Sequence, residues 1–236
     1  MATLLLVRHA QASFFGPTYD RLTEHGRRQA RLLGQHWLSS GIRPRRLVIG
    51  PLVRHRETAE LVGAEFLAAG CHWPETEIAD ELDEHQGIAV VKSLTGFGSA
   101  DSDAIHREPV AGVDRERIKR EYFSKYRDVL TEWASGRVAV EGMEDWRAFR
   151  SRASRGLDLL TSSGEENDII AAFTSGGFVS AGIGHLLDLA DSKVVEISFV
   201  VRNCSVAEIR FSERRRTLVS FNIVPDSLGG KAATFV

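Results

Sequence analysis

The stretch Leu4-Leu5-Leu6-Val7-Arg8-His9-Ala10 decides the fold expected of this chain. Its apolar run predicts a buried strand that ends in the cation of Arg8 and the imidazole of His9. Because α/β proteins bind ligands at the carboxyl ends of parallel strands, these two side chains are expected at a ligand site. Taken alone, the pair fits a strand end on the surface better than a site, and three later segments reverse that balance.

The composition is that of a soluble globular protein, with 43% hydrophobic and 26% charged residues in a chain of 236. The net charge of −2 gives no basic field for nucleic acid or an anionic membrane. Cys71 and Cys204 lie outside any C-x-x-C pair, so no structural zinc site is indicated. The first apolar run is too short for a secretory signal, and no stretch has membrane-span length, so a cytoplasmic location is expected.

Short apolar runs alternate with helical patterns along most of the chain. Such alternation predicts a three-layer α/β/α sandwich with a mostly parallel sheet. Buried strands are expected at residues 3–8, 47–50 and 168–174, with short strand-like runs at 78–82 and 194–200. The runs 205–211 and 218–223 flank a polar turn and predict a hairpin, through which the tail adds one antiparallel edge strand.

Residues 88–112 show no clear period and contain several Gly, Ser and Asp residues, which predicts a long excursion. Helical patterns follow at 118–133 and 146–160. We therefore expect a single domain over residues 1–236, with residues 88–135 as an inserted cap over the site. The charged face of the helix at 114–133 is either a homodimer surface or simply exposed.

Four segments carry polar side chains at the end of a predicted strand or the start of a predicted helix. In a parallel sheet these ends lie on one edge. The segments are Arg8-His9, Pro51-Leu52-Val53-Arg54, Leu82-Asp83-Glu84-His85 and Thr174-Ser175-Gly176-Gly177. Arginine forks match phosphate oxygens, and the free N–H groups of a helix start favour an anion. A histidine can attack phosphorus while a carboxylic acid protonates the leaving oxygen, so this set predicts phosphoryl chemistry.

These segments, in this order, resemble the histidine phosphatase superfamily and its phosphoglycerate mutase-like fold. The resemblance rests on Leu6-Val7-Arg8-His9, residues 20–26 with Gln29-Ala30, residues 50–54 with Glu57-Thr58-Ala59, Leu82-Asp83-Glu84, Asn203-Cys204-Ser205 and Ser220-Phe221-Asn222. It covers most of the chain and is weakest across residues 88–140. Each motif alone is weak, whereas the ordered set is specific.

The resemblance implies a role for each matching residue. His9 is expected to be the nucleophile, forming a phosphohistidine that water hydrolyses, while Arg8 and Arg54 hold the phosphate. The two arginines should lower the pKa of His9, and Glu84, as general acid, should have a raised pKa in the closed site. Neither a metal nor a cofactor is expected, because arginines supply the electrostatic stabilisation.

Further phosphate contacts are expected from Ser175, Gly176, Gln11 and Ser13. The chain departs from the family pattern at two positions. Ala10 follows the nucleophile where the family has glycine, and Ser175 stands where the family has a second histidine that donates to the phosphate. Losing one such donor costs about 3–4 kcal/mol of transition-state stabilisation, which predicts a slower enzyme.

The sequence therefore favours a metal-independent phosphomonoester hydrolase (a phosphoric monoester hydrolase of the phosphoglycerate mutase-like type) acting on a small-molecule phosphate ester. Two alternatives stay open. One is a phosphoglycerate mutase. The other is a catalytically weak phospho-ligand-binding protein, for which Ser175 is the argument.

Several other polar residues have a less specific interpretation. His55 is expected to be a surface or packing residue, and His85 either lines the pocket or packs. His106 and Arg107 are expected in a solvated loop, and Asn203 to satisfy backbone groups at a strand start.

Overall fold

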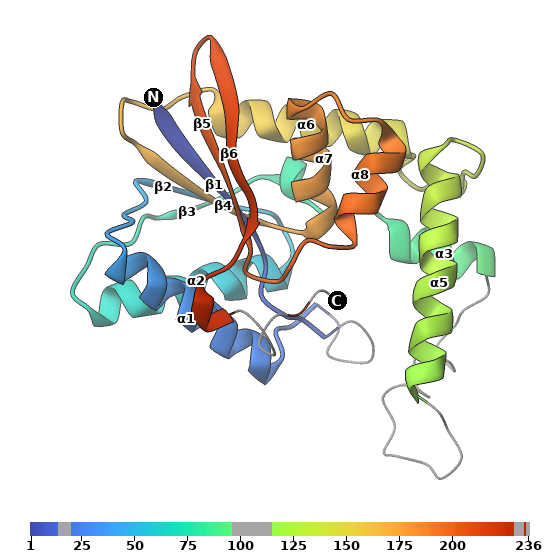
Figure 1. Cartoon of the computed structure of the whole chain (residues 1–236), viewed down its shortest axis with the longest axis horizontal. Coiled ribbons are helices and arrows are strands. Elements are labelled where there is room, and N and C mark those ends of the chain that lie inside the picture. The colour runs from blue at the N-terminus through green and yellow to red at the C-terminus, as the bar shows by residue number, and fades with distance from the viewer. Residues whose placement is uncertain (14–19, 96–114, 229–233, 235–236) are drawn as a thin grey trace.

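The protein is described by a computed structural model that covers residues 1–13, 20–95, 115–228 and 234. Figure 1 shows the arrangement of its elements. The strands are β1 (Ala2–Arg8), β2 (Arg46–Ile49), β3 (Thr76–Ile78), β4 (Ile169–Thr174), β5 (Val206–Ser212) and β6 (Arg215–Ile223). The helices are α1 (Glu24–Ser39), α2 (Val53–Ala68), α3 (Gly87–Thr95), α5 (Arg115–Ala134), α6 (Trp146–Thr161), α7 (Gly176–Leu186) and α8 (Asp191–Ser198), with 3₁₀ turns at Asp80–Leu82 and Asp226–Leu228.

The strands form one sheet in the order β3-β2-β4-β1-β5-β6. The neighbours from β3 to β1 are parallel, whereas β5 runs antiparallel to β1 and pairs antiparallel with β6. This confirms the predicted mostly parallel sheet with an antiparallel edge. The edge consists of both strands of the predicted hairpin, and β6 is the outermost strand.

Side chains of β1 alternate between two apolar cores, one on each face of the sheet. Leu4 and Leu6 join a cluster with α6 and α7, whereas Leu5 and Val7 join a cluster with α1 and α2. Figure 1 shows α1 and α2 on one side of the sheet and α6 and α7 on the other. The three-layer arrangement is therefore confirmed, and a central strand of this kind needs an apolar residue at nearly every position.

The helices beside the site begin at defined polar contacts. Thr23 caps α1 as predicted, since its side chain accepts a hydrogen bond from the Gly26 N–H at 3.0 Å. The first turn of α2 has no cap from its own N-cap residue. Instead, a carboxylate oxygen of Asp20 accepts from the Val53 N–H at 2.8 Å.

Three sequence predictions of local structure differ from the observed elements. Residues 194–200 were expected in a strand-like run, but α8 occupies most of them, with Val194 and Val195 buried. α8 packs beside α7, so tertiary packing outweighs the β-branched preference of those valines. The strand expected at 78–82 ends at Ile78 and continues as a 3₁₀ turn. The start of the excursion forms α3, and its residues 96–112 lie outside the described part of the chain.

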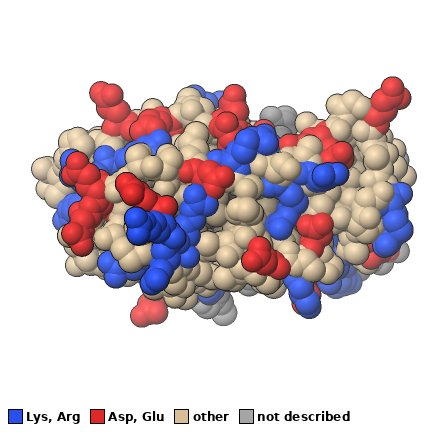
Figure 2. Space-filling model, turned by 90° about the horizontal axis from the view of Figure 1, so that it is seen from above, with Lys and Arg blue, Asp and Glu red and all other residues tan. Residues whose placement is uncertain are grey.

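Charges of both signs are mixed on the surface of the protein. The face in Figure 2 carries Lys and Arg side chains interspersed with Asp and Glu side chains. Among the described residues, no helix combines the length and apolar character that crossing a bilayer requires.

Truncating the α1 core should destabilise the protein. Leu33→Ala removes a fully buried side chain from the cluster between α1, α2 and the sheet, and should lower the free energy of unfolding by about 2–5 kcal/mol. Leu67→Ala, at an α2 position that is 65% exposed, is the matched control and should change it by less than about 0.5 kcal/mol. Urea denaturation of both variants measures the difference, and equal losses would contradict the packing described.

Candidate active site

Strand register brings the first and last of the four polar segments together. Arg8 of β1 is the register partner of Thr174 of β4, and the His9 N–H donates to the Thr174 carbonyl at 2.8 Å. His9 and Ser175 therefore leave adjacent parallel strands side by side. β2 ends next to β4, where the Gly50 N–H donates to the Phe173 carbonyl at 3.0 Å, and α2 begins shortly afterwards.

The hydrogen bonds of His9 define which ring nitrogen carries the proton. Its Nδ1 lies 2.7 Å from the Ala10 carbonyl oxygen, which can only accept. Its Nε2 lies 3.1 Å from Arg54 Nε, which can only donate. Both contacts require a proton on Nδ1 and a lone pair on Nε2. The imidazole is thus held in the tautomer that a nucleophile needs.

The environment of His9 also keeps its ring neutral. The side chain is buried, and burial is the largest cause that lowers its pKa well below the usual value. The positive charges of Arg54 and Arg8 lower the pKa further, in the direction predicted from the sequence. The Nε2 lone pair is therefore available at neutral pH.

Arg54 lies at the centre of the polar cluster and touches three side chains. Besides its bond to His9, its Nη2 donates to Ser175 Oγ at 3.3 Å, and its Nη1 pairs with Asp20 Oδ1 at 2.7 Å. Asp20 was not singled out in the sequence. The only signal that could have found it is its place at the start of the 20–26 segment of the family resemblance.

Arg8 approaches the start of α7 closely. Its Nη1 donates to the Val201 carbonyl, and burial lowers the pKa of Arg8 to about 10, which leaves it charged at neutral pH. A Cβ atom at Gly176 would lie 3.3 Å from Arg8 Nε. Gly176 therefore lets the guanidinium lie against the helix start, where free N–H groups add to an anion site.

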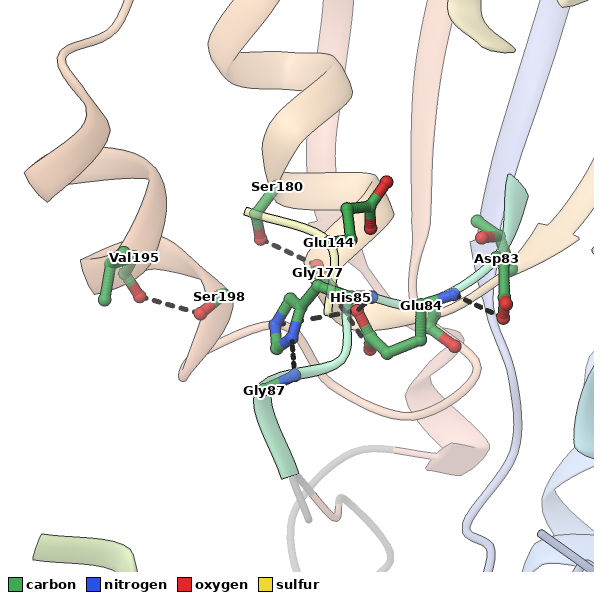
Figure 3. A network of polar contacts seen from close by, with 12 residues as sticks. Asp83, Glu84, His85, Gly87, Glu144, Gly177, Ser180, Val195 and Ser198 are labelled. Atoms are coloured by element: carbon green, nitrogen blue, oxygen red, sulfur yellow. Dashed lines mark hydrogen bonds and ion pairs between the residues drawn. The ribbon is translucent and has the colours of Figure 1, made fainter. Parts of the chain in front are cut away.

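Glu84 reaches the same helix start from the other side. Its Oε2 accepts from the Gly177 N–H at 3.3 Å, and its Oε1 accepts from the His85 N–H at 3.0 Å (Figure 3). A Cβ at Gly177 would lie 2.1 Å from Glu84 Oε1, so this approach requires glycine at position 177. The contact places the predicted acid beside the predicted phosphate site.

The raised pKa expected of Glu84 in the closed site is not found in the ligand-free site. Desolvation raises the pKa, but the combined effect of His85, Arg54 and the N–H groups of His85 and Gly177 is larger, and the pKa lies below its usual value. Glu84 is therefore ionised at neutral pH when no phosphate is bound.

The segment that carries Glu84 is fixed by an arginine from α6. Arg152 donates to the carbonyl groups of Glu81 and Asp83 at 3.1 and 2.8 Å and pairs with Glu144 at 2.7 Å. The helical pattern of α6 gave no sign of this role, because the contact spans about seventy positions of sequence. Arg152 holds the backbone of the acid segment in place.

His85 both packs and contacts the acid, which combines the two alternatives left open for it. Its buried ring packs against Trp133 and Phe149, with centroid distances of 5.6 and 5.3 Å. Its Nε2 lies 3.6 Å from Glu84 Oε1. The end of α5, at Trp133, is thereby tied to the segment that carries the acid.

The interpretation of His55 as a surface or packing residue is incomplete. The side chain is fully buried, and its Nε2 lies 2.6 Å from Ser175 Oγ. Its ring centroid is 5.8 Å from that of His9. His55 therefore belongs to the cluster, which its position on α2, one residue after Arg54, did not indicate.

The contacts described for the loop residues Gln11 and Ser13 lie at the start of α1 and in the segment before it. The Gln11 side chain accepts from the Thr23 hydroxyl at 2.8 Å, so it supports the start of α1. The Ser13 N–H donates to the Arg21 carbonyl. Their phosphate contacts stay predictions. His106 and Arg107 lie outside the described residues.

Two neighbours of the nucleophile have structural partners. The Asn203 side-chain amide donates to the His9 carbonyl at 3.0 Å, in agreement with the backbone role expected of it. Ala10 is fully buried, and its N–H donates to Thr58 Oγ1 at 3.0 Å.

Within the described residues, no cluster of His, Cys, Asp and Glu has the form of a metal site.

Residues 4–89 and 104–224 match the family model described as the histidine phosphatase superfamily (branch 1). A search of curated proteins finds no significant match. The fold is similar to that of YhfR from Bacillus stearothermophilus, at 17% identity and a TM-score of 0.64, covering 95% of this chain and 98% of that one.

Two further solved structures share the fold. A mycobacterial glucosyl-3-phosphoglycerate phosphatase has 19% identity and a TM-score of 0.59, with 93% of this chain and 98% of that chain covered. A phosphoglycerate mutase from Bacillus anthracis has 17% identity and a TM-score of 0.60, with 94% and 92% covered. At these identities the comparison shows a common fold.

The two buried histidines should make stability fall in mild acid. Burial lowers the pKa of His9 and His55 in the folded protein, so below pH 6.5 the unfolded chain binds more protons than the folded one. The free energy of unfolding should drop between pH 7 and pH 5, by up to about 1.4 kcal/mol per pH unit for each histidine.

Urea titrations at several pH values test this dependence. His9→Gln and His55→Gln should each flatten the slope, because each removes one group that gains a proton on unfolding. His36→Gln, at an exposed position near the end of α1, is the control and should leave the slope unchanged. A slope that does not respond to either buried substitution would contradict the prediction.

Proposed function

The chain belongs to the histidine phosphatase superfamily, and on that premise we propose that it hydrolyses phosphate monoesters through a phosphohistidine on His9. The observation that carries this proposal is the lone pair of His9 Nε2, which points at Arg54 Nε from 3.1 Å. A neutral nucleophile and a phosphate-binding cation thus meet at one point. The fold shared with phosphatases supports the same conclusion.

In the first step, the phosphate of the substrate binds between Arg8, Arg54 and the N-terminus of α7. The phosphate oxygens accept hydrogen bonds from the N–H groups of Arg54. These include the Nε–H that donates to His9 in the free site. Nε2 then attacks phosphorus, the N–P bond forms, and the P–O bond to the leaving group breaks with its electron pair on oxygen. Glu84 gives its proton to that oxygen, and the arginines stabilise the charge of the transition state.

In the second step, water attacks the phosphohistidine. The Glu84 carboxylate takes the proton from the water, and the N–P bond breaks with its electron pair returning to Nε2. His9 is neutral again, and Glu84 carries the proton taken from the water. When inorganic phosphate leaves, Glu84 releases that proton to solvent and returns to the ionised state of the free site. Arg152, which holds the carbonyl groups of the acid segment, keeps Glu84 in reach of both oxygens.

The ionised state of Glu84 in the free site defines when it gains its proton. A bound phosphate places negative charge beside the carboxylate, and a like charge raises the pKa of a carboxylic acid. Glu84 is accordingly protonated together with substrate binding. The raised pKa expected from the sequence belongs to the complex.

Substrate choice is assigned to residues 88–135, as a cap over the site. Two contacts of α5 support this assignment. Trp133 packs against His85, and the Tyr126 hydroxyl lies close to Gly87, where an added Cβ would be 3.0 Å from it. We propose a small-molecule phosphate ester as substrate, no metal requirement and a cytoplasmic location.

A phospho-ligand-binding protein is the second candidate, and Ser175 is the observation that favours it. A serine at the start of α7 carries no charge and one hydrogen-bond donor. Such a site would bind phosphate esters with little or no turnover. A mutase would instead return the phosphoryl group to an acceptor, and would exchange it between phosphoglycerates.

Hydrolysis of p-nitrophenyl phosphate in the presence of EDTA tests the proposal. The wild type should turn over, and His9→Ala should lose about 10³-fold or more of kcat/KM, because the nucleophile is removed. His36→Ala is the control and should match the wild type. Binding of phosphate without turnover would support the binding protein, and label exchange between phosphoglycerates would support the mutase.

Glu84→Gln should separate substrates by their leaving groups. A general acid contributes about 10²–10⁴-fold, and an alkyl phosphate depends on it more than an activated aryl phosphate does. We therefore expect a large loss of kcat on an alkyl phosphate and a much smaller loss on p-nitrophenyl phosphate. Glu196→Gln, on the exposed face of α8, is the control. Equal losses on the two substrates would argue against Glu84 as the acid.

A further inference from the structure

The hydroxyl group of Ser175 contacts both an imidazole and a guanidinium. Ser175 is fully buried, and its Oγ lies 2.6 Å from His55 Nε2 and 3.3 Å from Arg54 Nη2. Both partners come from consecutive residues at the start of α2. A serine at the start of α7 is thus held by two residues of a different helix.

The position of His55 depends on space that its neighbours leave free. A Cβ atom at Gly50 would lie 2.4 Å from His55 Nδ1, so the ring fits only because position 50 is glycine. The ring is tilted by 41° to that of His9 at a centroid distance of 5.8 Å. The His55 imidazole and the Arg54 guanidinium therefore both contact the Ser175 hydroxyl, and the His55 ring lies next to that of His9.

The number of hydrogen bonds that a hydroxyl group can form limits the partners of Ser175. A serine oxygen accepts two hydrogen bonds and donates one. Arg54 can only donate, so it takes one acceptor position. Burial and Arg54 lower the pKa of His55, so the imidazole is neutral and carries a single N–H. Among the described residues, His55 Nδ1 has no hydrogen-bond partner, whereas Nε2 faces Ser175 Oγ. With its single N–H on Nε2, His55 takes the second acceptor position, and the hydroxyl proton is left for a ligand.

We propose that His55 is a positioning residue of the phosphate site, donating from Nε2 to Ser175 Oγ so that the Ser175 hydroxyl donates to the bound phosphate. This inference rests on the proposed phosphatase function and extends it to a residue pair. The His55–Ser175 pair supplies the donor that the family resemblance assigns to a histidine at position 175. In this chain the imidazole comes from α2 and not from position 175 before α7, and the small serine side chain leaves room for it.

A histidine that only filled the core would have different consequences. Its replacement would lower stability without a specific effect on phosphate affinity, and its effect would add to that of a Ser175 substitution. A positioning residue acts through Ser175, so the two substitutions should not add. Removing both members should cost about as much as removing one.

The proposed role of His55 also predicts that restoring the family's histidine at position 175 does not by itself raise activity. In Ser175→His, the new imidazole would need the space that the His55 ring occupies 2.6 Å from the present Oγ. This variant should therefore lose activity. The double variant His55→Ala/Ser175→His removes the obstruction and returns one imidazole to the site, so its kcat/KM should exceed that of either single variant.

The experiment measures two quantities on each variant: kcat/KM with p-nitrophenyl phosphate and the Kd of inorganic phosphate by calorimetry. His55→Ala and Ser175→Ala should each lower kcat/KM by about 10²–10³-fold and weaken phosphate binding, as the loss of one transition-state donor does. Their combination should lower it no further. His55→Gln, which keeps a side-chain N–H, should recover part of the loss.

A second histidine–serine pair in the chain offers a matched control. His185 Nε2 lies 3.1 Å from Ser154 Oγ at an exposed position near the end of α7. His185→Ala removes this pair outside the polar cluster and should leave both measured quantities unchanged. Thermal unfolding of every variant separates loss of fold from loss of the site.

The outcomes keep the two proposals apart. Additive losses, or a Ser175→His variant that gains activity while His55 is present, would overturn the role of His55 and leave the phosphatase proposal intact. Absence of turnover in the wild type would overturn the phosphatase proposal. The phosphate Kd then decides for His55: a weaker Kd in His55→Ala supports the pair, and an unchanged or unmeasurable Kd overturns it.

Discussion

The parallel register between β1 and β4 is the constraint on which the rest of the site depends. Because Arg8 pairs with Thr174, the chain leaves the two central strands at the same level, and His9 and Ser175 emerge as neighbours. The parallel pairing of β4 with β2 places the start of α2 on the same edge. The contacts of His9 with Thr174 and Arg54 depend on this alignment, since a slip of one residue would turn the side chains to the opposite face.

Concentrated positive charge is the main electrostatic feature of that edge. Burial is the main cause that lowers the pKa of both His9 and His55. Arg54 lowers both pKa values further and Arg8 lowers that of His9, so both imidazoles are neutral. Asp20 and Glu84 offset part of the charge, one behind Arg54 and one at the start of α7. In the proposed mechanism, the fixed arginines stabilise a phosphate dianion without any reorganisation of solvent.

Much of this arrangement could be predicted from the sequence, because strands with apolar runs end in recognisable polar segments. Arg8, His9, Arg54 and Ser175 lie together for that reason. His55 could not be predicted, since a residue one step along a helix points about 100° away from its neighbour, and only the approach of Ser175, just before α7, brings His55 into the cluster. The contact of Asp20 with Arg54 joins distant positions, and the pKa of Glu84 depends on N–H groups that no pattern reveals.

The carboxylate of Asp20 has a consequence for the conformational entropy of the site. It accepts from the Val53 N–H and also pairs with the Arg54 guanidinium, so one group fixes both the start of a helix and the side chain that follows. An arginine loses up to about 2 kcal/mol of rotamer freedom when it is immobilised. Here that loss occurs when the chain folds. Ligand binding then does not have to order Arg54, and more of the interaction energy is left for affinity.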